Sequence, residues 1–173
     1  APCIPLAATE RLSASHCTAT SSRGPSWAAA SALRGRDRSG WTVRGPFCDG
    51  WPINHVIGDP ETGTIWAGGG GDWHGAGVWR SDDGGATWEV TRLSPGQMDE
   101  WAANDADFAA MIGWTPGKLP FDGVFSQVWS LGKSGDTLLA GTKPANLLSS
   151  QDGGRTWDRL EGLTNHPSAG SWN

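Results

Sequence analysis

The residue types best suited to holding a small polar ligand gather in two short runs of this chain and at one further glutamine. One run, WPINH, contains an indole, an amide and an imidazole, and the other, DWH, contains a carboxylate, an indole and an imidazole in succession. An indole supplies a flat apolar face and an imidazole can carry a proton near neutral pH, so these groups suit the recognition of a sugar. The candidate ligand-binding residues are Trp51, Asn54, His55, Asp72, Trp73, His74 and Gln127.

Both runs also have a structural explanation. His55 could equally hydrogen-bond the backbone of a neighbouring sheet, which is the commoner role of a lone histidine. Asp72–His74 lies in a glycine-rich loop, where a solvated loop tip is an equally good interpretation. For the loop tryptophans, packing and ligand binding remain equal alternatives at Trp51, Trp73 and Trp114.

Catalytic residues stay unassigned. A glycosidase of the usual kind needs two carboxylates beside the scissile bond. The available candidates are Asp49, Asp59, Asp72 and Asp122. None of the four stands out. The 4 histidines and 3 cysteines lack the spacing of a metal site or a disulfide framework, so we expect neither a metal nor another cofactor.

Two boxes of the pattern Ser-x-Asp-x-Gly-x-Thr-Trp lie 69 residues apart in the chain. The aspartate can accept hydrogen bonds from nearby backbone N–H groups, the glycine pair permits positive φ, and Thr-Trp suits the start of a returning strand. We therefore interpret both boxes as structural hairpins rather than as acid or cation sites. Their residues are Ser81, Asp83, Gly85, Thr87 and Trp88, and Ser150, Asp152, Gly154, Thr156 and Trp157.

The similarity continues upstream of each box and predicts two units of four short strands. The first unit has strands near 53–58, 63–68, 76–81 and 87–92, and the second has strands near 124–131, 136–141, 145–150 and 156–160. Three tryptophans fall on these strands, so we expect them to pack in the core or between blades: Trp66, Trp79 and Trp129.

These boxes resemble the Asp box, or BNR repeat, of the sialidase-like β-propeller superfamily, and WPINH resembles a segment of bacterial BNR-repeat glycosyl hydrolases. The resemblance implies an all-β fold, a partial β-propeller over residues 39–173 with blades near 53–92 and 124–160. It places the boxes on the periphery and the innermost strands beside a central ligand channel. About two to two and a half blades are visible, whereas a propeller closes with about 4–8. We therefore expect a fragment whose partners include the missing blades of its parent chain.

The resemblance leaves two functions open. Sialidases use a tyrosine nucleophile and an arginine cluster, but this chain has no tyrosine, and most of its arginines beyond the first residues fall in outer strands or boxes. One expectation is therefore a parent glycoside hydrolase acting on a carbohydrate, with this chain inactive by itself. The other is a non-catalytic binding or assembly propeller, because a fold does not fix a function.

Two segments depart from the repeat. Residues 1–38 are irregular and rich in Ala, Ser and Arg, which suggests a shifted reading frame, with a natural tail as the alternative. Trp41–Arg44 resembles the outer strand of a preceding blade. The insertion 93–123 predicts one helix near 96–112, capped by Ser94, that either shapes the mouth of a ligand site or packs on the rim. Its apolar stripe is Met98, Trp101, Phe108, Ala109 and Ile112.

The composition limits which classes of binding partner we expect. The net charge is −5 and no basic stripe is present, which argues against nucleic acid. No apolar run approaches the roughly 20 residues of a membrane span, and the start lacks the apolar core of a secretory signal. We expect no membrane partner and slightly favour the cytoplasm, although the compartment is not assigned.

Overall fold

The fold is that of a computed structural model, which describes residues 33–37, 40–44 and 47–171. β1 (Leu33–Asp37) and β2 (Gly40–Arg44) form an antiparallel hairpin. The strand expected at Trp41–Arg44 therefore falls within β2. β1 was not expected, since it lies in the segment predicted to be irregular. Residues 1–32, which carry most of the reading-frame hypothesis, lie outside the described part of the chain.

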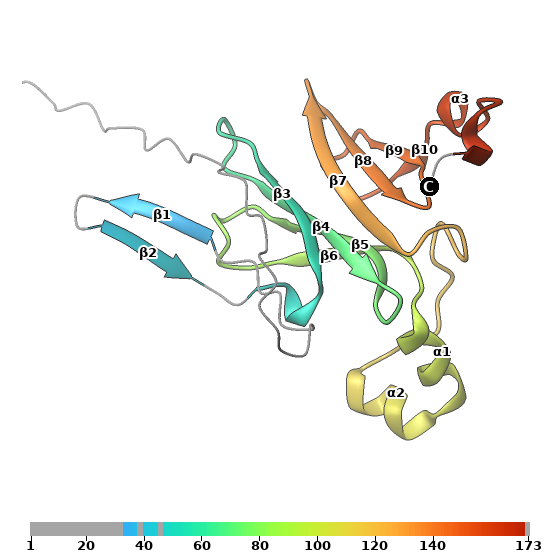
Figure 1. Cartoon of the computed structure of the whole chain (residues 1–173). Coiled ribbons are helices and arrows are strands. Elements are labelled where there is room, and N and C mark those ends of the chain that lie inside the picture. Colours follow the sequence, from blue (N-terminus) through green and yellow to red (C-terminus); the bar gives the residue numbers. More distant parts are fainter. Residues whose placement is uncertain (1–32, 38–39, 45–46, 172–173) are drawn as a thin grey trace, which may run out of the picture.

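Two antiparallel meanders, each of four consecutive strands, make up the body of the molecule (Figure 1). The first consists of β3 (Ile53–Gly58), β4 (Ile65–Gly71), β5 (Gly75–Ser81) and β6 (Glu89–Ser94). The second consists of β7 (Gln127–Ser134), β8 (Thr137–Lys143), β9 (Leu147–Ser150) and β10 (Asp158–Arg159). The antiparallel all-β class is therefore confirmed, and both predicted units are present.

The two meanders are joined in one eight-stranded sheet through a single residue pair, Gly70 of β4 with Gln127 of β7. Blades were expected as separate sheets, so this link departs from the expectation. It is confined to the first residue of β7, whereas β7 as a whole packs against both β3 and β4. Side chains rather than a hydrogen-bond ladder therefore make most of the contact between the meanders.

The main core lies between the meanders. Its members come from both units and include Trp66, Val78, Leu131, Leu138 and Leu148. Alternation along β4 brings Gly68 into the same contact, where an added Cβ would lie 2.7 Å from Cγ1 of Val128. The absence of a side chain at Gly68 is therefore what lets β7 approach β4 this closely.

A second core covers the opposite side of the first meander. Ala67 and Trp79 pack there against Cys48, the first residue of the short helix η1 (Cys48–Gly50), and against Trp51, which follows it. The rings of Trp51 and Trp79 meet edge to face with centroids 5.8 Å apart. An added Cβ at Gly77 would lie 2.8 Å from the Trp51 ring, so this glycine makes room for the indole.

The meanders meet head to tail. Trp79 of β5 corresponds to Leu148 of β9, since each lies two residues before the serine of its box. Leu148 is buried between the meanders, whereas Trp79 is buried on the side that faces away from the second meander. Repeating this interface would add further units in one direction, as in a ring or a filament, rather than closing a symmetric pair.

The outward side of the second meander is less covered. Leu139 and Leu147 correspond to the buried Trp66 and Val78 of the first meander, but both are only half-buried. Within the described residues, this side has no layer equivalent to the second meander.

The exposure of the three strand tryptophans follows from this packing. Trp66 and Trp79 are 4% and 5% exposed, so their expected core positions are confirmed. Trp129 is 52% exposed, so it does not lie in the described core, and packing between blades stays a prediction for it. It sits at a β-bulge of β7, at the position that Asn54 occupies in the bulge of β3.

The insertion forms two helices instead of the single one expected. α1 (Gln97–Asn104) and α2 (Ala106–Ile112) are separated by Asp105, whose extended backbone ends one helix while its side chain caps the next. Gly96 rather than Ser94 is the N-cap of α1, because Ser94 still belongs to β6. Short helices α3 (Glu161–Thr164) and η2 (Ala169–Ser171) follow β10. Across the described residues, the helices are too short or too polar to cross a membrane.

Candidate functional site

Both Asp boxes form the hydrogen-bonded turn that their sequence predicts. Asp83 Oδ1 accepts from the Ser81 hydroxyl (2.8 Å) and from the backbone N–H groups of Ala86 and Thr87 (2.9 Å each). Its Oδ2 accepts from the Thr87 hydroxyl at 2.6 Å, and Gly85 N–H donates to Ser81 Oγ at 2.8 Å. These bonds hold the pKa of Asp83 well below its usual value, with those from Thr87 contributing most.

The second box repeats this geometry. Asp152 accepts from the Ser150 hydroxyl at 2.8 Å and from the Thr156 N–H and hydroxyl at 2.9 and 2.6 Å. Partial burial alone would raise the pKa of Asp152, but these hydrogen bonds outweigh it and lower the pKa. Because these carboxylates are occupied by their own turns, the boxes serve structure rather than chemistry.

The second box also docks on the first meander. The carbonyl oxygen of Gly153 accepts from Trp66 Nε1 at 2.9 Å and from Arg80 Nη1 at 3.1 Å. Within the box, Trp157 is 6% exposed and donates from Nε1 to the Gly154 carbonyl at 2.9 Å. The second box therefore forms a turn and also contributes hydrogen bonds between the two meanders.

The candidates on β3 bridge the meanders. Asn54 Nδ2 donates to the Val128 carbonyl at 2.9 Å, and the Leu131 N–H donates to His55 Nδ1 at 2.9 Å. The latter is the backbone contact that the sequence analysis offered as the alternative to a ligand role. Gln127 supplies the single sheet pair with Gly70.

Trp51 is 6% exposed and packs in the second core, which is the packing alternative given for this loop tryptophan. It also contacts His74, with ring centroids 5.1 Å apart. Burial, helped by the charge of Arg92, holds the pKa of His74 below its usual value. Among the described residues, His74 Nδ1 has no hydrogen-bond partner.

The loop between β4 and β5 is held by the start of α1. Gln97 N–H donates to the Asp72 carbonyl at 2.8 Å, and Met98 N–H donates to the Trp73 carbonyl at 3.0 Å. These bonds satisfy two amides that a helix start leaves without intrahelical partners. The candidate loop and the insertion, separated in sequence by all of β5 and β6, therefore form one local structure.

Three aromatic rings meet where this loop touches the helices. Trp73 lies edge-on to Trp101 of α1 with centroids 5.5 Å apart, and Phe108 of α2 lies 6.4 and 6.3 Å from the two indoles. Trp101 is 61% exposed and Trp73 38% exposed. The sequence placed Trp101 in an apolar stripe, but Ala102 is the buried residue of α1. Sequence reasoning thus missed Trp101 as a surface residue of this site.

A shallow hollow of about 330 Å³ opens beside this aromatic group. It is lined by Glu100, Trp101, Asn104 and Asp105. Asp105 Oδ1 already accepts from the N–H groups of Asp107 and Phe108 at 3.0 and 2.9 Å. Asn104 Nδ2 donates to the Glu100 carbonyl at 2.7 Å, and the Glu100 side chain is exposed to solvent.

Arg92 and Asp99 anchor the insertion to the first meander. Arg92 makes a bidentate ion pair with Asp99, with distances of 2.8 and 2.5 Å. Asp99 also accepts from Trp114 Nε1 and from Gly96 N–H, at 2.9 Å each. Burial alone would raise the pKa of Asp99, but Arg92 and these donors lower it. The loop tryptophan Trp114 thus serves the anchor.

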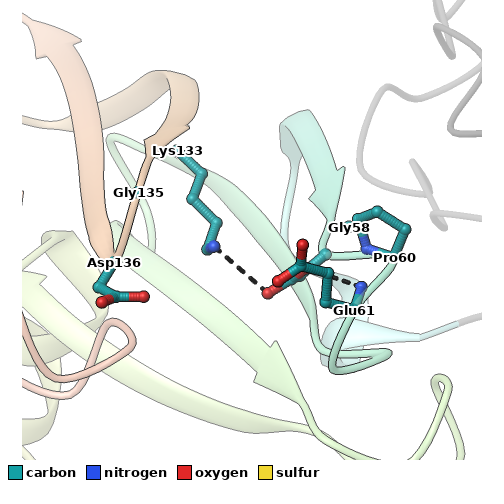
Figure 2. A pocket seen from close by; sticks show the side chains of 7 residues that line it. Gly58, Pro60, Glu61, Lys133, Gly135 and Asp136 are labelled. Carbon is teal, nitrogen blue, oxygen red and sulfur yellow. Dashed lines mark hydrogen bonds and ion pairs between the residues drawn. The ribbon is translucent and has the colours of Figure 1, made fainter.

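A second hollow, of about 410 Å³, lies between the β3–β4 and β7–β8 turns (Figure 2). Lys133 reaches across it to Asp59, with 3.3 Å between Nζ and Oδ2. Asp59 is 7% exposed and accepts from Glu61 N–H at 2.9 Å, a bond that holds the pKa of Asp59 below its usual value. This candidate acid is therefore committed to an ion pair between the meanders.

Of the other candidate acids, the Asp49 side chain lies outside the described part of the structure. Asp72 and Asp122 are exposed. Within the described ranges, no three His, Cys, Asp or Glu side chains come together in a way that could hold a metal.

Comparison with models of known protein families and with curated proteins found no match for the chain.

Proposed function

We propose that this chain contributes two blades of an Asp-box β-propeller of the sialidase-like class, and that its function is to bind a carbohydrate. The observation that carries the proposal is the head-to-tail packing of two meanders, each with a complete Asp box. A propeller repeats one such interface around an axis until the ring closes.

The outward side of the second meander supports the expectation of further blades. Leu139 and Leu147 are half-buried there and Trp129 is 52% exposed, at positions whose counterparts in the first meander contact the next unit. A third unit packed on this side would cover these side chains, as the second unit covers Trp66 and Val78. The missing blades are therefore proposed as the partner of this surface.

We favour binding over hydrolysis for this chain. A glycosidase acid needs a pKa raised by its surroundings. Each described carboxyl with a displaced pKa is displaced downward, and hydrogen bonds hold it ionised: Asp59, Asp82, Asp83, Asp99 and Asp152. A glycoside hydrolase is the second candidate for the parent protein, on the likeness of its WPINH run to bacterial enzymes.

The test measures binding and turnover on the same preparation. The chain is applied to an array of neutral and acidic glycans and is incubated separately with fluorogenic glycosides. We expect retention on at least one glycan and no release of fluorophore. Release that persists after repurification would replace the binding function with hydrolysis, and the absence of any retention would refute carbohydrate binding by this chain.

A further inference from the structure

We infer that the indole pair Trp73–Trp101, with the adjoining hollow on α1, is a binding site for a saccharide that carries no acidic groups. This inference rests on the proposed function and adds the place and the chemical class of the ligand. It places recognition on the helical insertion rather than on the innermost strands.

The two indoles have the geometry of a sugar platform. Their rings meet at 76° with centroids 5.5 Å apart, so an incoming ring that stacks on one indole meets the other as a side wall. Trp101 keeps 61% of its surface exposed, although a tryptophan is normally mostly buried. Phe108 packs edge-on against both rings.

The platform is fixed before any ligand arrives. The loop carbonyls of Asp72 and Trp73 are tied to the first amides of α1, and the ion pair between Arg92 and Asp99 ties α1 to β6. A site that needs little ordering loses less free energy on binding. This distinguishes the platform from a solvated loop tip, the alternative considered for Asp72–His74.

Polar groups for sugar hydroxyls border the platform on one side. The hollow of about 330 Å³ is bounded by Glu100, Asn104 and Asp105 beside Trp101. Carboxylates and amides can accept hydrogen bonds from hydroxyl groups, and a few such groups beside an apolar surface fix the orientation of a ligand.

Charge decides the class of sugar. Glu100 and Asp105 line the hollow beside Trp101, and the exposed Asp72 directly precedes Trp73 in the loop. The cation Arg92 is paired with Asp99. An anionic sugar in the hollow would meet the like charges of Glu100 and Asp105, which costs binding free energy. The geometry therefore suits uncharged pyranose chains and disfavours sialic and uronic acids.

The experiment compares neutral and acidic oligosaccharides on four proteins by isothermal titration calorimetry. The ligands are cellohexaose, laminarihexaose and chitohexaose against sialyllactose and hexagalacturonate. The variants are Trp101→Ala, Glu100→Gln and, as the matched control, Trp129→Ala, which removes another exposed indole on a different surface. Because all three side chains are exposed, each variant should keep the melting temperature of the parent.

We expect a neutral oligosaccharide to bind, Trp101→Ala to weaken it about tenfold, and Trp129→Ala to leave it unchanged. Tighter binding of the acidic sugars, or equal affinity in Trp101→Ala, overturns the inference while carbohydrate binding itself stands. If none of the five ligands binds the parent chain but the glycan array retains it, the class of sugar is wrong. If the array also fails, the proposed function has failed as well. Saturable binding of a protein or peptide at Trp101 in place of sugar would equally overturn the inference.

Discussion

The contact between Trp66 and the second Asp box gives a sharp test of the head-to-tail interface. Trp66 is 4% exposed, packs in the core between the meanders and donates to the Gly153 carbonyl at 2.9 Å. Truncating a buried tryptophan to alanine typically costs about 3–5 kcal/mol of unfolding free energy. We expect Trp66→Ala to fall in this range.

Two further variants separate the contribution of apolar packing at Trp66 from that of its hydrogen bond. Trp66→Phe keeps most of the apolar contact but removes the indole N–H, and the Gly153 carbonyl still accepts from Arg80 at 3.1 Å. Since that acceptor stays satisfied, the hydrogen bond should contribute about 1 kcal/mol or less. Trp129→Ala is the matched control, because a largely exposed side chain should change stability by no more than about 0.5 kcal/mol.

Urea unfolding followed by far-UV circular dichroism measures all three variants on one scale. With a slope of about 2 kcal/mol per molar urea, a loss of about 4 kcal/mol lowers the midpoint by about 2 M. Equal midpoint shifts for Trp66→Ala and Trp129→Ala would refute the reasoning, because the described core would then not hold the meanders together.

Three other outcomes follow from the same packing. Gly68→Ala places a methyl 2.7 Å from Val128 Cγ1 and should lower the free energy of unfolding, measured by thermal unfolding, by about 1–3 kcal/mol. Gly132→Ala is the control and should change little, because an added Cβ there has no neighbour within 4 Å; equal effects would contradict the close approach of β4 and β7. Folding lowers the pKa of Asp83 and Asp152, so their contribution to the free energy of unfolding is complete above the unfolded pKa of about 3.9 and is lost as the pH falls toward the folded values. In urea titrations between about pH 6 and 2, the stability of a double aspartate-to-asparagine variant should therefore approach that of the parent only at acid pH. A stability difference that does not change with pH would count against ionised carboxylates in the two turns. The pKa of His74 is lowered in the folded chain, so its neutral form is favoured. An NMR titration of this imidazole should give a midpoint below about 6.5, and a midpoint above that value would contradict its burial against Trp51.

The strands and the Asp boxes could be predicted because their signals are local. The Asp-x-Gly-x-Thr-Trp chemistry needs only residues within one turn, and the structure forms the same bonds in both boxes. β3 spans the residues predicted for it, and the other strands of the meanders differ by a few residues at their ends. Turn residues fix these ends to within the length of a turn.

The features that were missed depend on contacts distant in sequence. The apolar spacing from Met98 to Ile112 continues across the helix break, so periodicity did not reveal that Asp105 would cap a second helix. Trp101 looked like a buried member of that stripe, yet the insertion presents it to solvent. Neither outcome follows from the spacing alone, because spacing does not say which side of a helix will be covered.

The contacts between β3 and β7 show why the proposed ligand site lies on the insertion. Asn54 and His55 looked like ligand residues from their types, but their side chains bond the backbone of β7. Their counterparts at the bulge of β7 are Trp129 and Ser130, which are both exposed on the side proposed to take the next unit. In the first repeat these positions contact the following unit, which is why Asn54 and His55 are occupied by backbone contacts rather than open to a ligand. The Trp73–Trp101 platform is already fixed by its own backbone contacts, so it can recognise a ligand without the next unit.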